Sequence, residues 1–179
     1  LNEHFGDRNK GTEVELLEVA VEKHANRVLL QWFNARTNNR IPGLNTWDQI
    51  APRHATALAQ AAITIGDTTF LRHTFNYGVD EDSLGTMVFH AIKEKEPALL
   101  GILLDQNPPS EARDAAGLSY LHKAMELDSP GSLEELRKHD WFEKLADVLD
   151  RDGVPAVHYL VMKDLPNVFE TPDLLAHLD

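Results

Sequence analysis

The sequence predicts an all-α protein made of stacked helical repeats. Three stretches share the pattern D-x-x-G-x-x-x-x-H, and they run over residues 82–90, 114–122 and 150–158. The three copies follow one another at a nearly constant spacing of a little over thirty positions. A period of this length is typical of repeat proteins, in which each unit buries its apolar face against its neighbours. No stretch longer than four residues alternates cleanly between apolar and polar side chains, so we expect no strands.

Each copy of the pattern favours a turn followed by a helix. Asp at the first position can accept a hydrogen bond from a nearby backbone N–H, and Gly at the fourth position suits a type I turn. The turn pairs are Asp82 with Gly85, Asp114 with Gly117, and Asp150 with Gly153. An apolar or small run follows each turn, and a histidine then opens a helical segment. These histidines are His90, His122 and His158.

Helix-starting and helix-breaking residues divide the first half of the chain into short elements. Capping boxes are indicated at 12–15 and 46–49, where a Thr precedes a Glu or Gln by three positions. The first box precedes an apolar stripe at helical spacing that extends to Trp32. The elements that we expect after this stripe are a loop over 34–43 and helices over 56–62 and 69–77.

The second half contains short helices bounded by Pro, Gly and capping residues. Pro97 suits a first helical turn. Ser132 with Glu135, and Asp140 with Glu143, are candidate capping boxes for two further helices. The expected helices cover 89–95, 97–106, 121–127, a segment capped by Ser132, 141–149, 157–163, and a closing segment that starts at 171–172. The helix over 141–149 is extra relative to the other copies and accounts for the longer spacing before the last copy.

The charge balance favours some partners over others. The 179 residues include 17 basic and 29 acidic side chains, for a net charge of −12. Such a charge disfavours contact with nucleic-acid phosphates and anionic membranes. It is compatible with a basic protein partner, and equally with a role in solubility alone.

Cysteines and long apolar segments are both absent from the sequence. Without cysteine, the chain has no disulfide, no Cys-based zinc site and no Cys nucleophile. Its longest apolar runs, such as 98–104, are too short to span a bilayer, and no secretory signal opens the chain. Because the sequence starts at Leu1, we expect a trimmed chain or a piece of a longer protein.

The chain resembles ankyrin repeats, whose pattern is roughly D-x-x-G-x-T-P-L-H-x-A-A followed by a second-helix motif. The best match to the first part comes from Asp114, Gly117, Ser119, Leu121, His122 and Ala124. The second part is matched by Gly66, Phe70, Leu71, Gly78 and Asp80. No copy carries an intact T-P-L-H, Ala59 stands where the second repeat would have its histidine, and the fourth repeat has an insertion after Leu127.

The resemblance implies a domain organisation and a function. The fold would be an ankyrin-type solenoid of about five degenerate helix-turn-helix repeats, an L-shaped stack with turn hairpins on one side. A polar lead-in over 1–11 would precede the repeats 12–43, 44–81, 82–113, 114–149 with the insertion, and 150–179 as a cap. The function would be non-enzymatic recognition of a protein by the hairpin tips and the concave helix face, with the motif histidines bonding hairpins to helices.

Candidate binding residues follow from that expectation. The predicted tips carry Glu81, Glu111, Arg113 and Arg151 among further Asp residues, and form a mainly acidic edge. A shallow groove would be lined by Lys93, Lys123, Glu126 and Tyr159. Trp141 is either an exposed anchor for a partner or a core residue, and the same alternatives apply to Trp47.

The spacing of the histidines argues against a shared metal site. Stacked layers lie about 8–10 Å apart, whereas zinc needs ligand nitrogens at about 2.0–2.1 Å. His90, His122 and His158, at one per layer, therefore cannot meet on one ion. The sequence contains no nucleotide-binding, zinc-protease or nucleophile-elbow motif, so we expect no metal and no cofactor.

Two alternatives to a binding module remain. An enzyme, or the substrate-binding part of one, would place its chemistry in the inserted segment 128–150 or outside this chain, with His139 and Asp140 as a catalytic dyad. The competing interpretation of that pair is a turn with a helix cap. A purely structural spacer is the third possibility. We expect a cytoplasmic monomer, and a bacterial effector in a host cytosol is one setting compatible with such an array.

Overall fold

The chain is all-helical in a computed structural model, which describes residues 19–20, 23, 25, 27–29, 31, 52–76 and 78–162. The only β-type pairing within these residues is an isolated bridge between Leu149 and Pro155. The all-α prediction is therefore confirmed. Contacts divide the chain into two compact units, Leu1–Asp80 and Glu81–Asp179. Among the described residues, no helix has both the length and the apolar character needed to cross a membrane.

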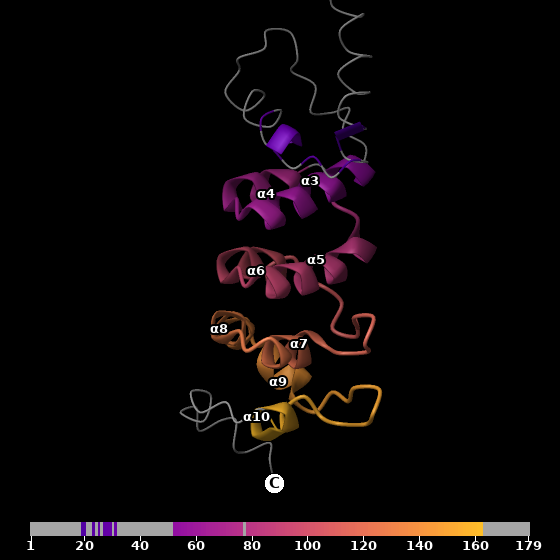
Figure 1. Ribbon diagram of the computed structural model, residues 1–179, viewed down its shortest axis with the longest axis vertical. Helices are drawn as coiled ribbons and strands as arrows, with labels where there is room; N and C mark the ends of the chain where they lie inside the picture. Colours follow the sequence, from indigo (N-terminus) through magenta and orange to yellow (C-terminus); the bar gives the residue numbers. More distant parts are fainter. Residues whose placement is uncertain are drawn as a thin grey trace, which may run out of the picture. The chain divides into compact units, whose positions relative to one another are not determined.

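The first unit contains one well-described helix pair, α3 (Pro52–Ile65) and α4 (Thr68–Phe75) (Figure 1). The two helices pack through fully buried apolar side chains that include Leu58 and Phe70. The side chain of Asp67 caps α4 by accepting a hydrogen bond from the Phe70 N–H at 2.9 Å. This cap satisfies one of the backbone donors that a helix start leaves unpaired.

The second unit is built in layers. Its helices are α5 (Glu81–Glu94), α6 (Pro97–Leu104), α7 (Tyr120–Glu126), α8 (Pro130–Lys138), α9 (Trp141–Ala146) and α10 (His158–Met162). The pair α5–α6 forms one layer and the pair α7–α8 the next, so that α5 packs on α7 and α6 packs on α8 (Figure 1). The extra helix α9 contacts α7 and α8, and α10 packs against α7.

The three helix pairs repeat the same backbone geometry. Within three positions after the end of each helix in a pair, one residue has a left-handed φ. These residues are Gly66 and Gly78, Lys95 and Asn107, and Asp128 and Asp140. At each first-helix end, the next N–H donates to the carbonyl five positions back, as from Glu96 to Ala91 at 3.1 Å and from Ser129 to Ala124 at 3.0 Å. Together with a second backbone hydrogen bond that it encloses, this hydrogen bond forms the Schellman motif, with which many helices end.

These helix ends define the structural register of the repeats. Lys95 is equivalent to Asp128, and Asn107 is equivalent to Asp140, with the same separation along the chain in both cases. The copies of the sequence motif in the same two repeats are separated by one position less than the helix ends are. The alignment by motif histidine is therefore wrong by one position between these two pairs, and Phe89, not His90, is the α5 residue equivalent to His122.

The first copy of the turn motif is not a turn. Asp82 and Gly85 lie within α5, and the helix continues through His90 without interruption. Gly85 is buried because the neighbouring elements approach it closely. A Cβ built there would lie 3.0 Å from the Ala112 Cβ and 3.2 Å from the Tyr120 hydroxyl. The glycine thus permits close packing of α5, whereas the sequence pattern predicted that it would form part of a turn.

The other two copies form the predicted turns, with matching hydrogen bonds. The Asp114 Oδ1 accepts from the N–H groups two and four positions later, each at 2.9 Å, and the Asp150 Oδ1 does the same. Gly117 and Gly153 occupy the left-handed region with φ of 85° and 77°. Both loops extend from the same side of the second unit (Figure 1).

The boundaries of the inserted region differ from the prediction. Helix α8 begins at Pro130, with Ser129 at the N-cap position, while Ser132 is buried with its hydroxyl 2.8 Å from that of Ser129. Asp140 has φ of 57° and makes no side-chain cap, and α9 ends at Ala146. The expected lead-in, most of the first repeat, the closing helix at 171–172, Trp32 and Trp47 lie outside the described residues.

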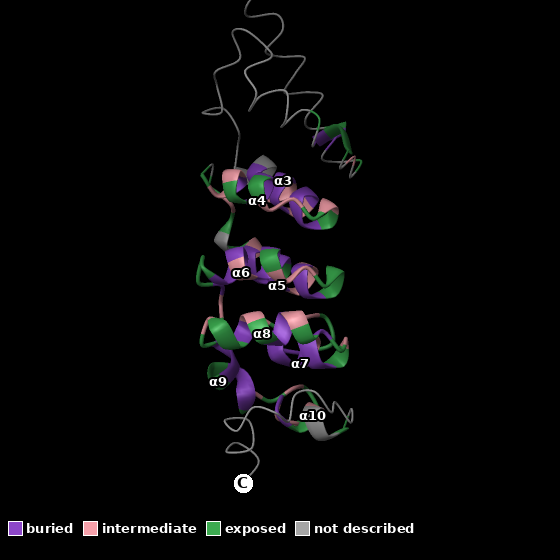
Figure 2. Cartoon of the chain, turned by 90° about the vertical axis from the view of Figure 1, so that its left-hand side faces the viewer, coloured by how far each residue is buried: buried purple, intermediate pink, exposed green. Residues whose placement is uncertain are grey.

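An aromatic cluster ties the second unit together. The Tyr120 ring lies 4.8 Å from that of Phe89 on α5 and 6.0 Å from that of Trp141 on α9, measured between centroids. Trp141 is only 5% exposed, and both α7 and α9 are buried over most of their length (Figure 2). Of the two alternatives for Trp141, the core role is correct and the exposed anchor is wrong.

Candidate functional site

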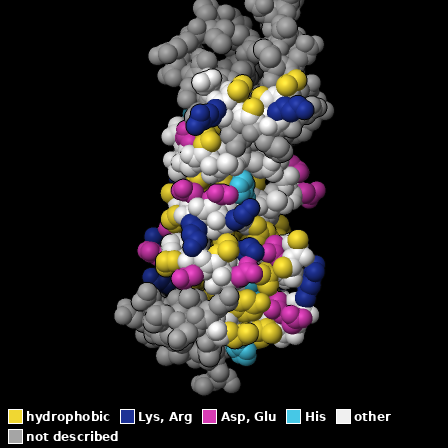
Figure 3. Space-filling model, in the orientation of Figure 1, with side chains coloured by type: hydrophobic (Ala, Val, Ile, Leu, Met, Phe, Trp, Pro, Cys, Tyr) yellow, Lys and Arg dark blue, Asp and Glu magenta, His cyan; other side chains and the backbone are white. Residues whose placement is uncertain are grey.

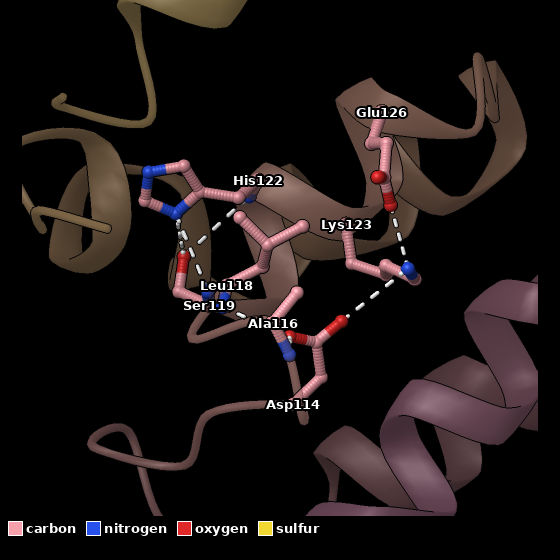
Figure 4. A network of polar contacts seen from close by, with 7 residues as sticks. All are labelled: Asp114, Ala116, Leu118, Ser119, His122, Lys123 and Glu126. Atoms are coloured by element: carbon pink, nitrogen blue, oxygen red, sulfur yellow. Dashed lines mark hydrogen bonds and ion pairs between the residues drawn. The ribbon is translucent and has the colours of Figure 1, made fainter. Parts of the chain in front are cut away.

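The Asp114 turn and the start of α7 form a compact polar network (Figure 4). Ser119 is the N-cap residue of α7 and shares a reciprocal capping box with His122. The His122 Nδ1 accepts from the Ser119 N–H at 3.3 Å and lies 2.7 Å from the Ser119 hydroxyl. Its Nε2 lies 3.1 Å from the carbonyl oxygen of Val154, in the next turn. Both ring nitrogens of this fully buried side chain are therefore occupied.

The hydrogen-bond partners fix the protonation of His122. Because the Val154 carbonyl can only accept, Nε2 carries the proton and Nδ1 keeps its lone pair in the neutral ring. Burial lowers the pKa of His122 below its ordinary value of 6.5, and the Val154 carbonyl and the Asp150 carboxylate offset part of this effect. The imidazole is thus a neutral structural link between two successive turns.

Lys123 connects the Asp114 turn to the outer surface of α7. Its ammonium lies 3.3 Å from the Asp114 Oδ2 and also bonds the Glu126 carboxylate. Burial by itself raises the pKa of Asp114, but hydrogen bonds from the Leu118 N–H, Lys123 and the Ala116 N–H together hold it below its ordinary value. The hydrogen bond to Glu126 raises the pKa of Lys123.

Tyr159 makes the corresponding link for the second turn. Its hydroxyl donates to the Asp150 Oδ2 at 2.8 Å, and its ring meets that of His122 edge-on with centroids 4.9 Å apart. The hydrogen bond to Asp150 raises the pKa of Tyr159 to about 12. The pKa of Asp150 is lowered, first by the Val154 N–H and then by Tyr159. Lys123 and Tyr159, both predicted groove residues, thus also stabilise the turns.

The other two motif histidines have different surroundings. His90 is half-buried on α5, and its Nε2 lies 3.4 Å from the Glu94 carboxylate one turn later. His158 is exposed and opens α10. The predicted bond between hairpin and helix is thus seen at His122, where full burial combines with a following turn that offers the ring a carbonyl.

The first helices of the second unit present a common outward face. The offset given by the helix ends aligns Lys93 with Glu126, and the offset between the two Asp turns aligns Glu126 with Met162. All three side chains are exposed. A second row, half-buried, consists of His90, Lys123 and Tyr159. We call these two rows the first-helix face, and it includes all four residues of the predicted groove.

The turn tips carry mixed charge. Asp114 and Asp150 bond their own backbone, so the charges that remain exposed near the tips belong to Glu111, Arg113, Arg151 and Asp152. Two are acidic and two are basic around these two turns, and Asp80 and Asp82, which the prediction also placed at a tip, are exposed as well. The mainly acidic edge stays a prediction. Acidic and basic side chains are likewise interspersed on the face drawn in Figure 3. The side chain of Glu81 lies outside the described residues.

The two members of the proposed dyad in the inserted segment have different surroundings. The ring partners of His139 are the Asp105 carboxylate at 3.4 Å and the Glu135 carboxylate at 3.7 Å. Asp140 is exposed, in the turn between α8 and α9. No group of three His, Cys, Asp or Glu side chains in the described part of the chain could hold a metal ion. His139 therefore connects the end of α6 to α8.

Sequence reasoning missed a hollow of about 650 Å³ beside the start of α5. It is lined by Asp82, Leu84, Gln106, Asn107, Pro109, Glu111 and Ala112. Asp82 and Glu111 are among the predicted tip residues, but for the loop that follows α6 the sequence analysis states only that the helix over 97–106 ends before it. Its two prolines, in the sequence N-P-P, were the available signal for a rigid loop that can form a wall.

No protein-family model matches this sequence. No curated protein is significantly similar to it either.

Proposed function

We propose that this chain is a non-enzymatic protein-binding module of the ankyrin type, and that it binds its partner through the first-helix face and the adjacent turns. The observation that carries the proposal is the bond from His122 to Val154. It joins two turns of matching hydrogen-bond pattern, so that successive layers present their surface as one connected unit. A preformed surface binds with a low ordering cost.

The position of the polar groups supports binding over catalysis. His122 has both ring nitrogens bonded within the protein, which leaves neither for a substrate. Lys93 and Glu126 are exposed at equivalent positions of neighbouring helices, and the partner of Glu126 is the surface residue Lys123. Such side chains can contact a partner without disturbing the core.

The test uses a charge exchange on the first-helix face. The purified 1–179 chain captures partners from a lysate, and the captured protein is then measured by direct binding to wild type and to the Lys93→Glu, Glu126→Lys double variant. Because net charge is unchanged, a general electrostatic effect is excluded. We expect at least tenfold weaker binding, since each reversed contact costs roughly 1 kcal/mol or more.

The matched control lies on α8, on the other row of helices. Glu134→Lys with Arg137→Glu also exchanges two exposed charges at constant net charge, and we expect it to bind like wild type. Equal loss in both variants, or in neither, would place the interface elsewhere. Circular dichroism melting of all three proteins checks that they remain folded.

A further inference from the structure

We propose that the hollow beside α5 receives an arginine side chain of the protein partner. This inference rests on the proposed function, because it names the chemistry of that partner. The hollow lies between the first turn of α5 and the loop that follows α6. Its volume of about 650 Å³ is within the range of roughly 300–1,000 Å³ that is common for ligand sites.

The lining changes in polarity from floor to rim. The least exposed members are the buried Leu84 and the half-buried Pro109 and Ala112. The exposed members are all polar or acidic, namely Asp82, Gln106, Asn107 and Glu111. An apolar floor with a polar rim suits a long side chain that has an apolar stem and a polar end.

The charge of the lining selects a cation. Both ionisable side chains of the lining, Asp82 and Glu111, are carboxylates, and the lining residues include no Lys or Arg. Gln106 and Asn107 add two amide oxygens as acceptors. A guanidinium offers five N–H donors in a planar fork, whereas an ammonium offers three from one atom. Acceptors spread over four side chains therefore favour arginine over lysine.

The loop wall is fixed before any partner arrives. The Tyr120 hydroxyl donates to the Pro109 carbonyl at 2.9 Å, and the Ala112 N–H donates to the same carbonyl at 3.2 Å. The neighbouring Arg113 bonds the carbonyls of Ser110 and Ala112, so its charge is engaged by the loop itself. Tyr120 is fully buried, which anchors the wall to the core.

The experiment is an NMR titration of the ¹⁵N-labelled 1–179 chain with acetyl-Ala-Arg-Ala-amide. The matched probe replaces arginine by citrulline, which has the same shape without charge. We expect shifts of the backbone amides of Asp82, Gln106, Asn107 and Glu111 with the arginine peptide, smaller ones with lysine, and none with citrulline. The shifts decrease as salt is raised, because both carboxylates are exposed.

A pair of charge-matched variants tests the assignment. Asp82→Asn with Glu111→Gln is expected to weaken arginine-peptide binding by roughly tenfold, since it removes two ion pairs. Asp128→Asn with Glu143→Gln makes the same change in net charge at exposed positions outside the lining, and is expected to bind like wild type. Shifts that persist in the first variant, equal shifts with citrulline, or no shifts at all would overturn the proposal.

Failure here is distinguishable from failure of the proposed function. If a captured partner depends on Lys93 and Glu126 but not on Asp82 and Glu111, the module binds protein and the arginine site is wrong. If the arginine peptide binds the hollow while no partner depends on the first-helix face, the arginine site is supported and the proposed binding face is wrong.

Discussion

The Nε2 of His122 lies 3.1 Å from the carbonyl oxygen of Val154, which belongs to the next turn along the chain. This bond joins the start of α7 to the turn that precedes α10. The same carbonyl also accepts from the Asp150 N–H at 3.0 Å within its own turn, so the bond from His122 adds a link between the two turns. Consequences for stability and for pH dependence can be measured.

Replacing His122 is expected to destabilise the chain far more than replacing His90. His122→Ala removes the polar contacts of both nitrogens of a fully buried ring and leaves a void, at a cost of about 2–4 kcal/mol in the free energy of unfolding. His90→Ala removes a half-buried pair with Glu94 and is expected to cost under about 1 kcal/mol. Urea denaturation of the two variants checks the difference, and similar costs would refute the distinction between these histidines.

The free energy of unfolding is expected to fall as the pH is lowered below about 6.5, partly through His122. Burial lowers the pKa of this histidine in the folded chain, so the unfolded chain binds its proton at higher pH. The contribution is fully present above the unfolded value of 6.5 and is lost as the pH falls through the folded pKa. Urea denaturation between about pH 7.5 and 5 should show a shallower pH dependence for His122→Asn than for wild type. Parallel curves would mean that other groups cause the loss.

Alanine at Gly117 is expected to cost more than alanine at Gly153. Both glycines have left-handed φ, so each replacement carries a backbone cost of about 1–2 kcal/mol. At Gly117, however, the new Cβ would also lie 2.8 Å from the Arg151 Cδ, whereas nothing lies within 4 Å at Gly153. Thermal unfolding measures both costs. The added variant Arg151→Ala should recover part of the Gly117→Ala loss, and additive effects would argue against this contact.

Alanine at Gly85 and at Gly101 should have opposite effects. Within a helix, Gly→Ala ordinarily stabilises by about 0.5–1 kcal/mol. Gly101 faces the end of the Glu135 side chain at 2.8 Å, which can rotate away, so the gain should remain. Gly85 faces Ala112 at 3.0 Å, in a loop that cannot retreat, so we expect a loss of about 1–2 kcal/mol. Equal stabilisation in urea denaturation would mean that the loop yields.

Local sequence signals were sufficient to predict the backbone structure where one residue sets the conformation of its neighbours. The turns at Asp114 and Asp150 were predictable because an Asp oxygen and a left-handed glycine act within one short turn. The helices α7 and α8 were likewise expected, over 121–127 and after Ser132, although α8 begins earlier, at Pro130. Lys93 and Glu126 are exposed, and their role in binding stays a prediction. Their alignment with each other was not apparent from the sequence.

Other features depended on contacts between distant residues. The same D-x-x-G letters form a helix at Asp82, because packing of α5 against the loop at Ala112 stabilises a helical Gly85 there. The burial of Trp141 and the hollow between Asp82 and Glu111 arise from segments brought together by the layers.

The sequence by itself determined that the chain is helical and where two of its turns lie. These properties follow from hydrogen bonds and backbone preferences between near neighbours in the chain. Only the tertiary structure decided the register between layers, the structural role of His122 and the surfaces that remain open. Those features depend on which side chains neighbouring layers bury. The free energy of that burial depends on contacts within the folded layers, and the order of residues along the chain does not show these contacts.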